Sequence, residues 1–236
     1  MHHVVLERWS RAASPLHARD ARAKVVALMI FLVAVSTTAP RAQAAFAGYA
    51  LLLAAAIPIA RLPVAALLRR AALVLPFSAT FALITWWAGD PMRALSLAEK
   101  SFLSGLAVLL AMATTPLLQL VGALDSIRVP GPILLVIQFL YRYLFVVSEQ
   151  AQHMRLAARC RMGTGHRYAA RFRAAAGAVG VLFARSWERA DGIDRAMLAR
   201  GFSGRFPAPE PLRFGWRDSA FVCACAAVSL AVRLAL

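Results

Sequence analysis

The chain has 236 residues, of which 61% are hydrophobic and only 16% are charged, and its mean hydropathy is +0.64. A soluble chain of this length could not bury so much apolar side chain in one core without leaving large apolar patches on its surface. The composition therefore indicates a membrane protein and disfavours a soluble enzyme.

The formal net charge of +16 comes from 27 lysines and arginines against 11 acidic residues. Such an excess can indicate a nucleic-acid partner, but thirteen of the basic residues lie between Glu149 and Arg217, and five precede Val25. Because the apolar runs are nearly free of them, the pattern is typical of cytoplasmic segments of a membrane protein. We expect a lipid bilayer, and no nucleic acid, as the partner of this charge.

Residues 1–24 are polar and basic and lack the apolar core of a signal peptide, so we expect the N-terminus to remain and to lie in the cytoplasm. Five apolar segments have about the length that a bilayer requires; they cover residues 25–39, 42–60, 71–87, 102–121 and 219–236. Pro58, Pro76 and Pro116 lie in or near three of them, where kinks are expected.

The connections between these segments determine the expected topology. Arg41 is assigned to the first connection, Arg61, Arg69 and Arg70 to the second, and Arg93 and Lys100 to the third. With a basic N-terminus inside, four crossings return the chain to the cytoplasm near Gly122.

The apolar run at 133–147 is not expected to cross. As a helix it would be only about 22 Å long, and it contains Gln138 and Arg142. Crossing there would also place the thirteen basic residues of 149–217 outside, against the positive-inside bias.

Two long cytoplasmic helices are expected instead. One begins after Pro130-Gly131-Pro132 and runs to about Arg161, with its polar residues on one face. The other covers about 168–200 and ends at Gly201. The predicted fold class is an all-α membrane protein with about five transmembrane helices and long amphipathic cytoplasmic helices. Its expected parts are a four-span unit at 1–132, a cytoplasmic module at 133–217 and a final span at 218–236.

Sites for catalysis, cofactors or metals are not expected. Lys24 and Lys100 are the only lysines, and neither follows a glycine-rich phosphate loop. The terminal pair His2 and His3 is weak evidence for a metal. The acidic residues are assigned to hydrated flanks, so no ion relay within the membrane is expected; they include Asp20, Asp125, Asp191 and Asp194.

The three cysteines are expected to be unreactive packing residues. Cys223 and Cys225 are two positions apart, so on a helix they point in nearly opposite directions and could not share a ligand. Cys160 stands alone in the sequence.

Two stretches, 154–163 and 195–204, each carry Ala-Arg near the end of an expected helix, with glycine at or soon after the helix end. A small alanine lets a partner approach, and the guanidinium offers a rigid fork of donors to carboxylates or helix-end carbonyls. Equally, the arginines could only cap helix C-termini, which contributes a few tenths to about 1 kcal/mol. The spacing alone does not decide between docking and capping.

Several stretches together resemble the transmembrane T component of energy-coupling factor (ECF) transporters, closest to its cobalt/nickel branch, the CbiQ-like family. The resemblance covers most of the chain, and its motifs are specific in combination. They are Leu6-Glu7-Arg8, Ser14-Pro15-Leu16-His17, Asp20-Ala21-Arg22-Ala23-Lys24, Tyr141-Arg142-Tyr143-Leu144-Phe145, Arg185-Ser186-Trp187-Glu188-Arg189 and Ala196-Met197-Leu198-Ala199-Arg200-Gly201-Phe202.

This resemblance implies a non-catalytic scaffold in a bacterial cytoplasmic membrane. Two ABC-type ATPase subunits would power a separate substrate-binding S subunit through it, for uptake of cobalt, nickel or a vitamin. The family's Ala-Arg-Gly coupling motifs fall on Ala158, Arg159 and Cys160 and on Ala199, Arg200 and Gly201. Cys160 replaces the family's glycine, so the backbone conformation at the end of the first helix is an open question.

Two other classes of function remain as alternatives. A self-contained secondary transporter or channel would need an ionisable residue within the membrane and a broken-helix repeat. A membrane scaffold without a transport role would not copurify with two ATPases.

Overall fold

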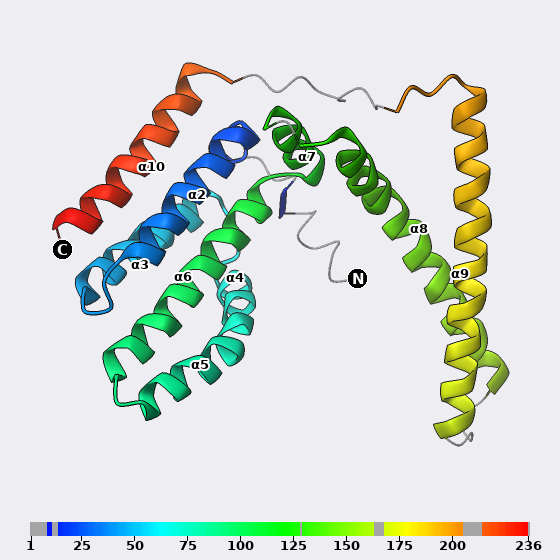
Figure 1. Ribbon diagram of the computed structural model, residues 1–236, viewed down its shortest axis with the longest axis horizontal. Coiled ribbons are helices and arrows are strands. Elements are labelled where there is room, and N and C mark those ends of the chain that lie inside the picture. The colour runs from blue at the N-terminus through cyan, green and yellow to red at the C-terminus, as the bar shows by residue number, and fades with distance from the viewer. Residues whose placement is uncertain (1–8, 11–13, 128, 163–167, 205–213, 236) are drawn as a thin grey trace. The chain divides into compact units, whose positions relative to one another are not determined.

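The structure is a computed structural model that describes residues 9–10, 14–127, 129–162, 168–204 and 214–235. Within these ranges every regular element is a helix, so the prediction of an all-α membrane protein is confirmed (Figure 1). The elements are α2 (Ala21–Thr37), α3 (Gln43–Ile59), α4 (Val64–Ala71), the 3-10 helix η1 (Ala72–Val74), α5 (Leu75–Trp87), α6 (Pro91–Thr114), α7 (Leu117–Ser126), α8 (Gly131–Met162), α9 (Tyr168–Ala199) and α10 (Trp216–Ala235).

The chain forms two compact units. Unit 1 comprises residues 1–127 and 210–236, so the last helix packs with the first ones, and unit 2 comprises residues 128–209. Each unit is described by itself below.

In the part of the chain that the structure describes, three stretches are long and apolar enough to cross a membrane: Val64–Trp87, Pro91–Thr114 and Gly131–Arg161. The third includes the run 133–147, for which the charge distribution predicts no crossing. Because length and composition do not place a helix in a bilayer, that reading and the count of five crossings stay predictions.

The expected first span borrows a helical turn from its basic flank, because α2 begins at Ala21. Its start is fixed by Asp20, whose side chain accepts a hydrogen bond from the Arg22 backbone N–H at 2.8 Å. Near two of the three prolines the α-helical backbone is interrupted: η1 precedes Pro76, and the extended Thr115 precedes Pro116.

The expected fourth span, 102–121, is wrong at both ends. The helix α6 begins at Pro91 and ends at Thr114, and α7 follows as a separate short helix. Arg93 and Lys100 therefore lie in α6, and Arg69 and Arg70 lie in α4, not in connections. The expected helix boundaries left these charged residues out, because the sequence does not show what their side chains contact.

The core of unit 1 lies where α2, α3 and α6 pack together. Phe31 of α2 meets Tyr49 of α3 edge-on, with ring centroids 5.6 Å apart. The buried Tyr49 hydroxyl lies 3.2 Å from the Thr38 hydroxyl and donates to the Ser229 carbonyl of α10 at 3.5 Å. Next to it, a Cβ on Gly48 would lie 2.9 Å from a Val232 methyl. Glycine at 48 thus permits α10 to approach α3 closely.

Both lysines of the chain join α2 to α6, one at each end of the pair. The Lys24 ammonium, at the start of α2, donates to the Thr114 carbonyl at the end of α6 at 2.8 Å. The Lys100 ammonium, in α6, donates to the Ser36 and Thr38 carbonyls at the end of α2, at 2.9 and 2.7 Å. A cation at a helix C-terminus satisfies carbonyls that have no partner within the helix. We call these two contacts the lysine clamp.

The placement of Asp20 in a hydrated flank was wrong. Asp20 is buried, and its backbone N–H donates to the carboxylate of buried Asp218 at 3.2 Å. Asp218 also accepts from the Gly215 backbone N–H at 3.0 Å, which fixes the start of α10. A carboxylate 198 positions along the chain thus covers the start of α2, and no sequence pattern shows that pairing.

Unit 2 is a hairpin of the two long helices α8 and α9, each of 32 residues (Figure 1). The predicted helices to about Arg161 and over 168–200 are confirmed. Among the described residues of this unit only Leu134 is buried. The hairpin thus has almost no core of its own.

Candidate coupling site

The second motif forms the end of α9. Gly201 has a φ of +74°, its N–H donates to the Leu198 carbonyl at 3.0 Å, and the Phe202 N–H donates to the Met197 carbonyl at 3.0 Å. These two bonds and the left-handed glycine constitute a Schellman motif. Glycine is favoured at 201 because a side chain would disfavour that backbone conformation. The motif ends α9 at Ala199 and leaves Arg200 at the cap.

Arg200 is exposed at this helix end. Within the described part of the chain its guanidinium has no ion pair, whereas Arg195, about one turn earlier, binds Asp191 at 2.6 Å. The five donors of Arg200 are therefore available to an external acceptor such as a carboxylate.

The first motif has a different geometry. Arg159 and Cys160 lie inside α8, which continues to Met162, and both are exposed. Because Cys160 has a helical backbone, a cysteine there needs no glycine-like conformation. The backbone conformation at Cys160, which the sequence left open, is therefore helical. Gly163, the next glycine along the chain, lies outside the described residues.

A groove runs between the two helices beside the first motif. Its volume is about 760 Å³. Alanines from both helices form its floor because their short side chains leave room; they are Ala151, Ala158, Ala174, Ala175 and Ala178, with Met154, Val179 and Leu182. Arg155 and Arg159 of α8 and Arg171 of α9 also line it. We call this the arginine-rimmed groove.

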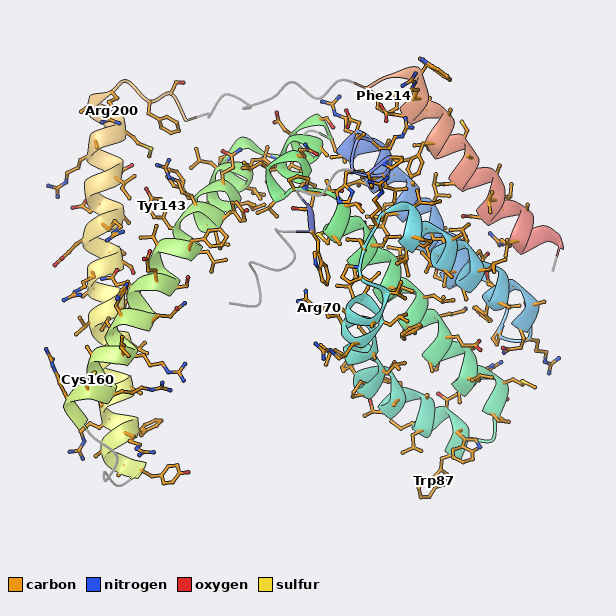
Figure 2. All side chains as sticks on the ribbon, turned by 180° about the vertical axis from the view of Figure 1, so that it is seen from behind. Arg70, Trp87, Tyr143, Cys160, Arg200 and Phe214 are labelled. Carbon is orange, nitrogen blue, oxygen red and sulfur yellow. The ribbon has the colours of Figure 1, made fainter. Side chains whose placement is uncertain are left out.

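The two motifs lie far apart in unit 2. Figure 2 shows Cys160 and Arg200 at opposite ends of the hairpin. The 32 residues of α9 separate them by about 48 Å, at 1.5 Å per residue. One ligand of small-molecule size could not contact both, whereas two macromolecular partners could each take one.

Other stretches quoted for the resemblance are placed as follows. Tyr141 stacks edge-on against Phe145, with centroids 5.3 Å apart, and the Arg142 guanidinium lies 5.9 Å from the Tyr143 ring centroid. Trp187 is exposed on α9. Leu6-Glu7-Arg8 and the pair His2 and His3 lie outside the described residues.

The cysteines differ from expectation. All three are free, but Cys160 and Cys223 are exposed and Cys225 is partly buried, so they are not buried packing residues. Among the described residues, no three histidine, cysteine or acidic side chains gather as metal ligands.

Sequence reasoning missed the buried polar contacts of unit 1. Lys24, Lys100, Asp20 and Asp218 each fix a helix end there. The available signal was the rarity of lysine, since a chain that uses arginine elsewhere retains lysine at only two positions. A compact ammonium fits between converging carbonyls where a planar guanidinium does not.

Comparison with known proteins identifies the family of this chain. A family model described as "CbiQ: Cobalt transport protein" matches residues 12–210. The cobalt transport protein CbiQ of Rhodobacter capsulatus is 31% identical over 110 residues, which are 43% of this chain and 44% of that protein. An uncharacterised protein of Methanocaldococcus jannaschii is 27% identical over 104 residues, 44% of this chain and 38% of that protein. The chain thus aligns with less than half of each relative. Since the family model spans most of the sequence, the chain belongs to the CbiQ family of cobalt transport proteins and is a membrane component of that family.

Proposed function

We propose that this chain is the transmembrane T component of an ECF-type ABC importer for cobalt or nickel. In this proposal two ABC-type ATPases bind and hydrolyse ATP, and a separate S subunit binds the metal. The chain transmits motion between them and performs no catalysis itself. Its place is a bacterial cytoplasmic membrane, with the N-terminus and the module 133–217 in the cytoplasm.

The observation that carries the proposal is the pair of exposed arginines at opposite ends of the hairpin. Arg159 and Arg200 each lie beside a small alanine, near a helix end, and neither has a described ion-pair partner. Separation by a rigid helix allows each to hold one ATPase. Charge-assisted bonds from a guanidinium fork to a carboxylate or to helix-end carbonyls would supply the anchor.

Transmission would follow from the shape of unit 2. A hairpin with almost no buried core owes its form to its long helices, so force applied at either end moves a helix as a lever. Its exposed apolar side chains offer a contact for the S subunit, since apolar packing is non-directional and tolerates sliding.

A secondary transporter or channel is the runner-up. Glu99 and Lys100 do lie in α6, and Asp20 and Asp218 are buried, so ionisable residues are present in unit 1. However, Lys100 and Asp218 are committed to backbone groups at helix ends. This commitment favours a structural role for them over an ion relay.

The test uses the complete importer in cells. We expect Arg159→Ala and Arg200→Ala each to reduce uptake of radioactive cobalt or nickel, and the double variant to abolish it while the chain still inserts. Losing a desolvated charged partner weakens an interface by about 2–5 kcal/mol. The matched control is Arg161→Ala with Arg189→Ala, which removes the same charge from exposed positions of the same helices. Normal uptake in the Arg159/Arg200 double variant would overturn the proposal.

A further inference from the structure

Arg61, at the end of α3, has a backbone conformation that favours glycine. Its φ is +55°, and in the described ranges it is the only residue other than glycine with a positive φ. The Arg61 N–H donates to the Pro58 carbonyl at 3.0 Å, and the Leu62 N–H donates to the Ile57 carbonyl at 3.4 Å. These bonds form the Schellman motif that also ends α9, with arginine in the place of Gly201. Because a side chain disfavours this conformation, Arg61 makes the end of α3 less stable than a glycine would.

The charge of Arg61 has no acidic partner within the described part of the chain. Its side chain is exposed and forms no ion pair there. The sequence contains no acidic residue between Asp20 and Asp90; Asp20 is buried at the start of α2, and Asp90 pairs with Arg93 at 3.2 Å. Strained backbone is concentrated at functional sites, where the side chain is needed. We therefore looked for an external anion that Arg61 could bind.

Exposed apolar side chains flank Arg61 in the chain. Ile59, the last residue of α3, is 50% exposed, and Val64 and Leu68 of α4 are 48% and 39% exposed. Val64 and Leu68 are four positions apart and therefore adjacent on α4, whereas Leu67 is buried. Exposed apolar side chains continue beyond α4; they include Leu73, Phe77, Phe81 and Ile84. A ligand that covers this surface must combine an anionic group with an apolar body, which inorganic phosphate lacks.

We propose that the α3–α4 corner, residues 59–68, binds an anionic phospholipid. Arg61 contacts the headgroup phosphate, whose geometry matches a guanidinium fork, and the exposed apolar side chains of the corner contact an acyl chain. A short helix with an apolar face and flanking arginines is the pattern of a segment in a membrane interface. The chain is a membrane component of its family, so lipid already surrounds its apolar helices. The site shares no residue with the two coupling motifs and does not depend on the proposed ATPase contact.

The first test separates the backbone of Arg61 from its side chain. Arg61→Gly and Arg61→Asn both place a residue that tolerates a positive φ at this position and both remove the charge. In detergent without added lipid, we expect the Tm of the full chain to rise by about 3 °C. Binding of phosphatidylglycerol, measured by native mass spectrometry, should weaken about fivefold or more. The matched control is Arg41→Gly, which removes an exposed arginine before the other end of α3. It should not raise the Tm and should leave phosphatidylglycerol binding unchanged.

A second test distinguishes a lipid from a free phosphate. Val64→Thr with Leu68→Gln makes the exposed face of α4 polar and leaves Arg61 in place. Weaker phosphatidylglycerol binding in this variant, and failure of excess inorganic phosphate to displace the lipid from the wild type, would support the proposal. Equal binding of phosphatidylcholine, equal loss in Arg41→Gly, unchanged binding in Arg61→Gly, or full displacement by phosphate would overturn it. Arg159 and Arg200 stay unchanged in every variant, so metal uptake tests the proposed function separately.

Discussion

In unit 1 both lysines donate hydrogen bonds to carbonyl oxygens of neighbouring helices. In unit 2, by contrast, every arginine whose side chain is described is exposed. The two cations serve different purposes. A compact ammonium with three donors satisfies converging carbonyls inside a bundle, and a planar fork suits a carboxylate or phosphate on another molecule. The lysines thus contribute to the packing of unit 1, whereas Arg159 and Arg200 of unit 2 are exposed near helix ends.

Burial differs in the same direction. Unit 1 has a continuous apolar core between α2, α3 and α6, but the described part of unit 2 buries only Leu134. Large exposed apolar surfaces mark contacts with proteins or lipids. Such side chains are exposed on α8 and α9 of unit 2 and also on α5 of unit 1, where Phe77 and Trp87 are exposed.

The largest expected effect is all-or-none. It is the side of the membrane from which an introduced cysteine can be labelled. In a chain without its native cysteines, Ser203→Cys in unit 2 should react with an impermeant maleimide only in inside-out vesicles. Ala88→Cys, in the connection between α5 and α6 of unit 1, should react only in intact cells. The expectation follows from the thirteen basic residues at 149–217. Labelling of Ser203→Cys in intact cells would contradict the topology.

The lysine clamp should carry much of the stability of unit 1. Lys24→Met keeps the apolar stem but leaves the Thr114 carbonyl and buried Asp20 and Asp218 without the ammonium. We expect the free energy of unfolding in detergent to fall by about 3 kcal/mol, as for other broken buried charge contacts. Lys24→Arg should restore only part of it.

Thermal unfolding followed by circular dichroism provides this measurement. The matched control is Arg41→Met, because Arg41 is exposed and should leave the unfolding free energy within about 0.5 kcal/mol. Equal stability of Lys24→Met and Arg41→Met would mean that the clamp contributes nothing measurable.

Replacing a glycine by leucine should have a smaller effect on stability, with opposite signs in the two units. Gly48→Leu should destabilise unit 1 by about 2 kcal/mol, because its Cβ would meet Val232 in a packed contact. A Cβ on Gly177, in α9, would meet no atom within 4 Å, so Gly177→Leu should stabilise that helix by about 0.5 kcal/mol through helix propensity.

Hydrogen exchange resolves the two glycine effects, since it reports on each helix separately. Faster exchange in α3 and α10 for Gly48→Leu and slower exchange in α9 for Gly177→Leu are expected. Destabilisation of α9 by Gly177→Leu in the isolated chain would show that this helix has a packing contact absent from the structure.

Local sequence signals were sufficient for unit 2. Pro130-Gly131-Pro132 and Gly201 delimit its helices, and the Schellman motif at Gly201 explains why that glycine ends α9. They were insufficient for unit 1. Lys100 was assigned to a connection, yet it lies in α6 and caps α2. Asp20 was assigned to water, yet Asp218 covers it from the other end of the chain.

The sequence likewise predicted one part of the candidate site and not the other. The sequence alone marked Ala-Arg at both helix ends, but not that Arg159 lies within its helix while Arg200 lies at the cap. The arginine-rimmed groove could not be predicted either. Its lining alternates between two helices, and their relative rotation depends on packing that single-helix periodicity does not contain.

The most direct test of the central claim is the mass of the complex that the tagged chain retrieves from native membranes. Two ATPase subunits per chain are expected for the wild type, fewer for Arg159→Ala or Arg200→Ala, and none for the double variant, while the S subunit remains bound. A wild-type complex without ATPases, or a double variant that still carries two, would contradict the account.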